Sequence, residues 1–285
     1  MRRGTQAAVE GDVGAELTHI PYCGLPPAPG GALLAWKLDP IVIGLFISLA
    51  VAYGRGAAAA GLSPLQRRLF WAGWALTGFA LICPLCPISV SLFSARVGQH
   101  MILTLVAAPM VAAGRPFRAL SALAGRPAPE RSARSAAFVL PATGMFALAL
   151  WYWHTPGPYG ATFASTAVYW TMHVTLYGSA LWLWSTLLAS HRSHPVRALA
   201  SGLISTVQMG FLGAVITLAP HAMYAPHFLT TIAWGLTPLQ DQQLGGVIMW
   251  VPGCVVFLAV ALWGVAPLMS ERPARRAAPL EPAAS

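Results

Sequence analysis

The sequence predicts an all-α integral membrane protein: a bundle of seven transmembrane helices with the N-terminus outside and the C-terminus in the cytoplasm. The first observation behind this prediction is composition, since 9% of the 285 residues are charged and 56% are hydrophobic. About a quarter of the residues in soluble domains are charged. The second is the length of the apolar stretches, which matches the thickness of a bilayer. The third is the uneven distribution of arginine between the loops.

The expected spans are long, apolar and almost free of charge. They are residues 38–54, 69–88, 97–113, 136–153, 165–188, 198–219 and 241–266. Prolines at 84, 87, 109 and 252 are expected to kink or end their helices. The flanking segments are rich in Gly, Pro and Ala, and no uninterrupted apolar stretch marks a signal peptide. We therefore expect a disordered extracytoplasmic tail at 1–37, the transmembrane domain at 38–266 and a disordered cytoplasmic tail at 267–285.

Basic residues set the expected orientation. The loops after the first, third and fifth spans and the segment after the seventh hold thirteen arginines. The opposite side holds Arg2, Arg3, Lys37 and Arg96. Because basic loops stay in the cytoplasm, this asymmetry puts the N-terminus outside. It also explains the net charge of +9 without nucleic acid, because no basic run carries interleaved aromatic residues.

Five of the eight histidines fall at or near the expected outer ends of the spans. They are His100, His154, His173, His221 and His227. Three methionines lie within two residues of them, namely Met101, Met172 and Met223. Imidazole suits copper and zinc, and thioether sulfur favours Cu(I). This gathering predicts a copper site at the outer membrane boundary. The alternative is that each histidine is solvated or caps a helix, and that the methionines only pack.

His173 lies inside the fifth span, with Tyr169 and Tyr177 four residues to either side. An ionisable side chain in a membrane is costly and usually faces the bundle interior or a water-filled cavity. The simpler alternative is a hydrogen bond to a neighbouring helix. His154 follows an aromatic interface belt, in a Pro/Gly turn that fixes the direction of its ring.

Cys83 and Cys86 form a C-x-x-C motif at the outer end of the second span. In an oxidising compartment the pair is expected to form a disulfide; when reduced, it is suited to Cu(I). A single motif of this kind is weak support for a metal site. Cys23 and Cys254 look isolated, and Cys254 is expected to be a buried apolar thiol.

The start of the last span is unusually polar. Asp241 is one of two acidic residues between positions 40 and 270. It is expected to accept a histidine N–H behind the metal site, to cap its own helix, or to bind metal directly. Gln242 and Gln243 are expected to support the same site. The following Gly245 and Gly246 permit close approach of a neighbouring helix.

Several motifs, in this order, resemble the CtaG family of cytochrome c oxidase assembly factors, the multi-spanning caa-type group. They are Gln99-His100, Pro109, Gly114-Arg115-Pro116, Trp153-His154-Thr155-Pro156, His173, Thr217-Leu218-Ala219-Pro220 with Tyr224, and Asp241-Gln242-Gln243-Leu244-Gly245-Gly246 with Met249-Trp250. The resemblance spans roughly residues 40–266. Two departures stand out. Arg96 occupies a position where the family often has a second histidine, and the Cys83/Cys86 pair is not expected across the family.

The resemblance implies a non-enzymatic role in respiratory-chain biogenesis. Its members assist assembly of haem–copper oxidases, forming the copper centre beside the high-spin haem. The implied cargo is copper, carried by a metallochaperone. The implied partners are the oxidase catalytic subunit and other copper chaperones, in the bacterial inner (plasma) membrane. The alternatives are a haem- or quinone-binding redox protein, a copper transporter and a receptor-like seven-span protein.

Overall fold

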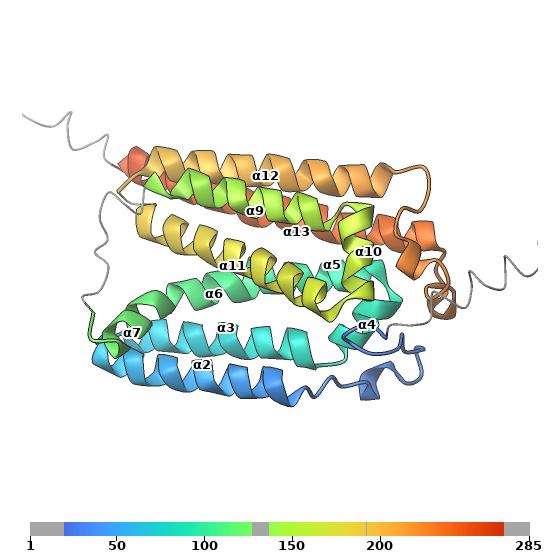
Figure 1. Ribbon diagram of the computed structural model, residues 1–285. Coiled ribbons are helices and arrows are strands. Elements are labelled where there is room, and N and C mark those ends of the chain that lie inside the picture. Colours follow the sequence, from blue (N-terminus) through green and yellow to red (C-terminus); the bar gives the residue numbers. More distant parts are fainter. Residues whose placement is uncertain (1–19, 127–136, 192, 271–285) are drawn as a thin grey trace, which may run out of the picture.

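The computed structural model describes residues 20–126, 137–191 and 193–270. Within these ranges all regular structure is helical, and the long helices run side by side (Figure 1). The α-helices are α2 (Pro40–Ala59), α3 (Pro64–Ile82), α4 (Leu85–Ser91), α5 (Phe93–Met101), α6 (Ala108–Ala113), α7 (Pro116–Leu123), α9 (Val139–Trp153), α10 (Pro156–Ala164), α11 (Thr166–Ser190), α12 (Pro195–Leu218) and α13 (Pro238–Ser270). A π-helical stretch, η2 (Ile102–Ala107), joins α5 to α6, and short 3-10 turns are η1 (Ala32–Leu34), η3 (Ala225–His227) and η4 (Ile232–Trp234).

Several of these helices suit a bilayer. By length and composition, four described stretches can cross a membrane: α2, the continuous Phe93–Ala113, α12 and Pro238–Gly264 of α13. The pair α3 and α4, bent by 45°, makes a fifth if it counts as one span. Large apolar side chains such as Ile41, Val207 and Val255 are exposed, as lipid-facing side chains are. The prediction of an all-helical membrane protein is confirmed at this level.

The connections alternate between the two ends of the bundle (Figure 1). Residues 20–39, α4, α10 and the connection between α12 and α13 lie at one end, which we call the α10 end. The α7 end carries α7, the connection from α11 to α12 and the C-terminal part of α13. The α7 end also holds the end of α2 and the starts of α3 and α12. These segments and the flanks of α7 carry the described arginines Arg55, Arg67, Arg68, Arg115, Arg118, Arg126 and Arg197.

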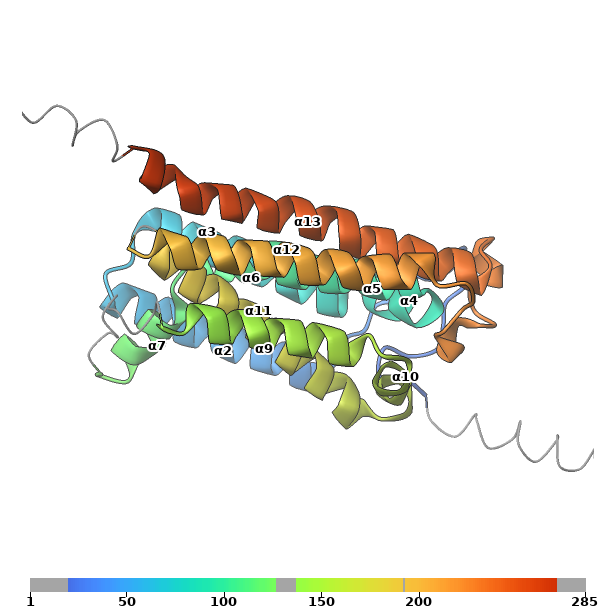
Figure 2. The same cartoon turned by 90° about the horizontal axis from the view of Figure 1, so that it is seen from above.

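Helix α13 packs along α12 (Figure 2) at a distance that only glycine permits. A Cβ on Gly246 would lie 2.2 Å from Thr217 Oγ1 and 2.9 Å from the Gly213 carbonyl oxygen. On its other side, a Cβ on Gly245 would lie 2.5 Å from the Phe93 ring of α5. The expected close approach of neighbouring helices at these glycines is therefore confirmed, and it seats α13 against both α12 and α5.

The stretch Phe93–Ala113 changes its helical pitch in the middle. Pro109 has no N–H to donate, and its ring crowds the preceding turn. The preceding residues form the wider turn η2, and the Trp184 indole N–H of α11 donates to the Thr104 carbonyl oxygen there at 2.8 Å. Turns of this type are frequent at functional sites. This one begins directly after His100 and Met101.

Part of the expected N-terminal tail is packed. In the segment 20–37, Tyr22 and Cys23 are buried, and Cys23 forms a disulfide with Cys86 of α4. The Pro27 carbonyl oxygen accepts hydrogen bonds from Ser91 Oγ at 2.9 Å and from the Trp234 indole at 3.2 Å. The composition of this segment predicts disorder, but contacts with residues far away in the sequence hold it in place. Composition does not reveal such contacts. Residues 1–19 and 271–285, also expected to be tails, lie outside the described residues.

Candidate metal site

Three histidines from three helical segments meet inside the bundle toward its α10 end. His100 lies on α5, His154 directly follows α9 and His173 lies on α11. The ring centroids of His100 and His173 are 5.5 Å apart, and those of His100 and His154 are 5.9 Å apart. All three side chains are at most 5% exposed. We call His100, His154 and His173 the histidine cluster.

Hydrogen bonds fix two of the three rings. His154 Nδ1 lies 2.7 Å from the Leu150 carbonyl oxygen, and His173 Nδ1 lies 3.0 Å from the Tyr169 carbonyl oxygen. A carbonyl only accepts, so both Nδ1 atoms carry the proton and both Nε2 atoms present a lone pair when the rings are neutral. Metal-binding histidines are held in this way, with the other ring nitrogen donating to a carbonyl or carboxylate.

The remaining nitrogens are buried without partners. His173 Nε2 and both ring nitrogens of His100 have no hydrogen-bond partner in the described structure. A buried polar atom without a partner costs about 1–3 kcal/mol. Three such atoms so close together indicate a group that completes them. In the positions shown, however, no three His, Cys, Asp or Glu side chains of the described residues are arranged to hold a metal ion.

Neighbouring contacts hold the cluster in place. Gln99 Nε2 donates to the Ala80 carbonyl oxygen at 2.7 Å, which ties α5 to α3 beside His100. The Tyr224 hydroxyl donates to the His154 carbonyl oxygen at 2.8 Å. Helix α9 ends at Trp153, and Pro156 starts α10, so His154 occupies a short fixed turn.

The other two expected histidines are not in the cluster. His221 is exposed in the connection between α12 and α13. His227 is buried there, but its Nε2 pairs with the Tyr159 hydroxyl at 2.6 Å, and its ring lies against Phe163. Sequence reasoning placed all five histidines at one level. The expected spans leave His221 and His227 in the connection between 219 and 241, but a position along the chain does not show which rings point toward a common site.

The expected methionine ligands have mixed positions. Met101 and Met172 are buried in the core, and Met223 is half-buried. The main-chain N–H of Met223 donates to Gln242 Oε1 at 2.7 Å. A role for these three sulfurs as ligands stays a prediction.

Arg96, one helical turn before His100, is a cation whose burial beside the cluster was not predicted from the sequence. Its side chain is 1% exposed, and Nη1 donates to Thr162 Oγ1 at 2.6 Å. The guanidinium carbon lies 4.1 Å from the ring centroid of Phe163 and 5.8 Å from that of Tyr169. Among the described residues no carboxylate pairs with it, and its Nε has no partner. The positive charge is therefore fixed beside the cluster.

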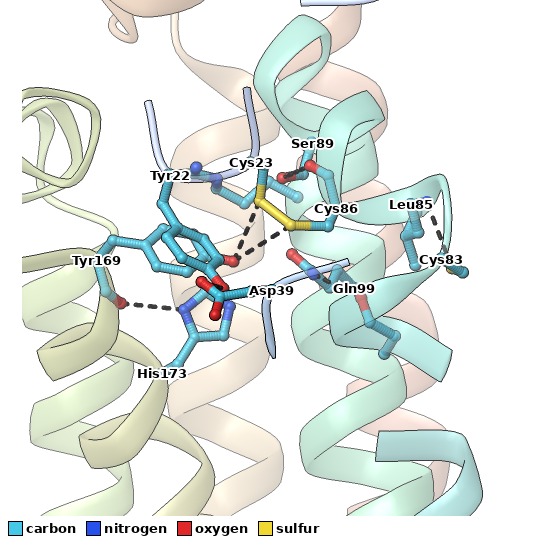
Figure 3. The surroundings of a disulfide bond; sticks show 12 residues. Tyr22, Cys23, Asp39, Cys83, Leu85, Cys86, Ser89, Gln99, Tyr169 and His173 are labelled. Atoms are coloured by element: carbon cyan, nitrogen blue, oxygen red, sulfur yellow. Dashed lines mark hydrogen bonds between the residues drawn. A yellow bond between two sulfur atoms is a disulfide. The ribbon is translucent and has the colours of Figure 1, made fainter. Parts of the chain in front are cut away.

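The disulfide corrects the expected pairing of Cys83 with Cys86. Cys86 instead bonds to Cys23, 63 residues earlier, and Cys83 is a free, buried thiol (Figure 3). Cys83 Sγ accepts a hydrogen bond from the Leu85 N–H at 3.3 Å. Cys254, expected to be buried, is half-buried on α13. Sequence spacing missed the pair because a fold, and not a local motif, brings Cys23 to α4.

Tyr169 connects this disulfide to the histidine cluster (Figure 3). Its hydroxyl oxygen lies 3.2 Å from Cys23 Sγ and 3.6 Å from Cys86 Sγ. Its ring centroid is 4.3 Å from that of His173 and 4.8 Å from that of Tyr22. The two sulfurs are thus separated from the cluster by one aromatic side chain.

Asp241 contacts the start of a helix, and no hydrogen bond joins it to a histidine among the described residues, so its expected role behind the metal site stays a prediction. Its carboxylate accepts the N–H of Phe93 at 2.7 Å, the N–H of Ser94 at 3.1 Å and the Ser94 hydroxyl at 2.5 Å. It therefore caps the start of α5, the helix that carries His100. Gln242 Nε2 donates to the Ile216 carbonyl oxygen at 3.2 Å and holds the connection after α12. Gln243 is half-buried on the same turn.

A comparison with known proteins supplies the family. No match was found among curated proteins or among solved structures. A family model described as the cytochrome c oxidase caa3 assembly factor matches residues 45–271, well over half of the chain. That range contains the histidine cluster, Arg96 and the polar start of α13. The chain therefore belongs to the CtaG family of cytochrome c oxidase caa3 assembly factors.

Proposed function

We propose that this assembly factor is a non-enzymatic copper handler, which receives Cu(I) at the histidine cluster and delivers it to the catalytic subunit of a haem–copper oxidase. The observation that carries the proposal is the cluster itself. Three buried imidazoles converge, two of them with Nδ1 tied to a main-chain carbonyl, and three ring nitrogens lack partners. Neutral imidazole is a good ligand for copper.

The spacing of the rings supports this role. With metal–nitrogen bonds of about 2.0–2.1 Å, two imidazole centroids on one tetrahedral metal lie roughly 5 Å apart. The observed separations of 5.5 and 5.9 Å are slightly wider. Small side-chain rotations that turn the free nitrogens toward a common point would close the difference. The buried, apolar surroundings disfavour hydrated divalent ions relative to Cu(I).

The proposal includes seven spans: α2, α3 with α4, α5 through α6, α9, α11, α12 and α13. It places the protein in the bacterial inner membrane, with the α10 end on the side away from the cytoplasm. Two independent features support this orientation. Arginines concentrate at the α7 end, as expected for the cytoplasmic side. The disulfide lies at the α10 end, and disulfides persist outside the cytoplasm.

The test is the metal content of the oxidase made without this protein. Oxidase purified from cells lacking the chain is expected to contain normal haem and to lack copper at the binuclear centre. Complementation with His100→Ala, His154→Ala or His173→Ala should leave the defect in place. His221→Ala, at the same end but outside the cluster, is the matched control and should restore copper.

Other results would contradict the proposal. If oxidase from the deletion cells contained its full copper content, the protein would not be needed to deliver copper. A Soret band in the purified protein that disappears in His100→Ala would instead favour haem binding. Membrane vesicles that accumulate copper only when the protein is present would favour transport.

A further inference from the structure

We propose that Cys23 and Cys86, once reduced, form a second copper site: a dithiolate that captures Cu(I) above the histidine cluster. This inference rests on the proposed copper-handling function and adds the place where copper first binds. It starts from the contact of both sulfurs with one tyrosine hydroxyl, at 3.2 and 3.6 Å. Tyr169 also contacts His173 with its ring and its carbonyl oxygen.

The segment that carries Cys23 is partly exposed. Leu25 is 71% exposed, whereas Cys23 is 4% and Cys86 0% exposed. Besides the disulfide, residues 20–37 are held by two hydrogen bonds to the Pro27 carbonyl oxygen and by the Lys37 N–H, which donates to the Ile82 carbonyl oxygen at 3.0 Å. Tyr22 adds a hydrogen bond to Asp39 at 2.9 Å and stacks on Tyr169. An incoming thiol reductant therefore has to displace this segment locally before it reaches the disulfide.

The redox step is a thiol–disulfide exchange. A dithiol reductant attacks the Cys23–Cys86 bond, the S–S bond breaks, and the reductant becomes a cyclic disulfide. Two electrons and two protons pass to the protein, which now carries two thiols. Cu(I) then replaces both thiol protons and forms a two-coordinate complex with one net negative charge. Soft thiolate sulfur is a preferred ligand for Cu(I).

Arg96 supplies the charge that this complex needs. Burying an unpaired anion is expensive, and the guanidinium has no carboxylate partner among the described residues. It lies 5.8 Å from the ring centroid of Tyr169, whose hydroxyl touches both sulfurs. A cation already buried against the tyrosine whose hydroxyl touches both sulfurs would stabilise the anionic copper complex. When the thiols regain protons, Cu(I) is released beside His173.

The experiment uses the full-length protein in detergent, oxidised or reduced with a dithiol under anaerobic conditions. Cu(I) is titrated against a chromophoric chelator. Reduced protein is expected to bind one more equivalent than oxidised protein, and X-ray absorption should show sulfur ligands only in the reduced sample. Cys23→Ser and Cys86→Ser should each lose that equivalent. Cys83→Ser, three residues from Cys86, and Cys254→Ser are matched controls that should keep it.

Thermal unfolding of each variant shows whether it folds. A folded Cys23→Ser protein that still binds the additional equivalent would overturn the dithiolate site. So would equal copper stoichiometry in oxidised and reduced wild-type protein. Both results concern sulfur alone and leave histidine-bound copper measurable. Failure of the proposed function would give a different result: oxidase from cells lacking the protein would contain its full copper content.

Discussion

Replacing Asp241 tests whether the buried carboxylate supports a helix or a metal ligand. Asp241 is 0% exposed and accepts three hydrogen bonds at the start of α5. Asp241→Ala leaves two buried N–H groups without acceptors, at about 1–3 kcal/mol each. Removing the carboxylate also removes its own desolvation cost, so we expect a net loss of about 2–4 kcal/mol in unfolding free energy.

The assay is an unfolding titration in mixed micelles, followed by tryptophan fluorescence. Asp241→Asn should fall between wild type and Asp241→Ala, because its amide nitrogen faces a donor. Ser94→Ala removes only the hydroxyl bond and should cost about 0.5–1.5 kcal/mol. Gln243→Ala, half-buried on the same turn, is the control and should cost little. If Asp241→Ala kept wild-type stability but lost copper, the carboxylate would belong to the metal site instead.

Two further predictions concern packing and pH. Gly246→Ala places a methyl group against Thr217 and should destabilise the protein by about 1–3 kcal/mol; Gly178→Ala, with nothing within 4 Å of its Cβ, should not. Burial, with the nearby Arg96 charge, lowers the pKa of His227 to about 3. The folded state therefore favours the neutral form of His227. Its contribution to the free energy of unfolding is full above about pH 6.5 and is lost as the pH falls toward 3, at about 1.4 kcal/mol per pH unit. In His227→Phe, unfolding should take up one proton fewer between these pH values, so the unfolding free energy should change less steeply with pH. An unchanged slope would show that His227 does not titrate in this way.

The helical framework could be predicted because bilayer thickness and helical rise act on contiguous residues. The expected stretch 198–219, for example, differs from α12 (Pro195–Leu218) by a few residues. In the expected span 69–88, the interruption predicted from Pro84 and Pro87 is observed as a bend of 45° between α3 and α4. Proline predicts that a helix is interrupted, but packing decides where the next one begins.

The histidine cluster could be predicted only in part. Position along a span places a residue at a depth, which is why His100, His154 and His173 were expected at one level. Depth does not give direction around the bundle, and His221 and His227 lie in a connection whose path depends on Gln242 and Tyr224. The disulfide and the capping of α5 by Asp241 could not be predicted, because each joins residues far apart in sequence.

Arg96 offers a sharper test of two copper sites, because its charge acts on them with opposite sign. Cu(I) on three neutral imidazoles is a cation and is repelled by the guanidinium one turn away, whereas the dithiolate complex is an anion and is attracted. Even at a separation on the order of 10 Å, two unit charges interact by about 1.7 kcal/mol at an effective dielectric constant of about 20, which corresponds to more than roughly tenfold in affinity.

Arg96→Gln should therefore tighten Cu(I) binding at the histidines in oxidised protein and weaken it at the thiols in reduced protein. Arg96→Lys keeps the charge and should resemble wild type at both sites. A loss of packing would weaken both sites together, so only the opposite shifts support the electrostatic argument. The same charge would weaken copper binding at the histidine cluster, which suits the proposed delivery of the metal to an oxidase.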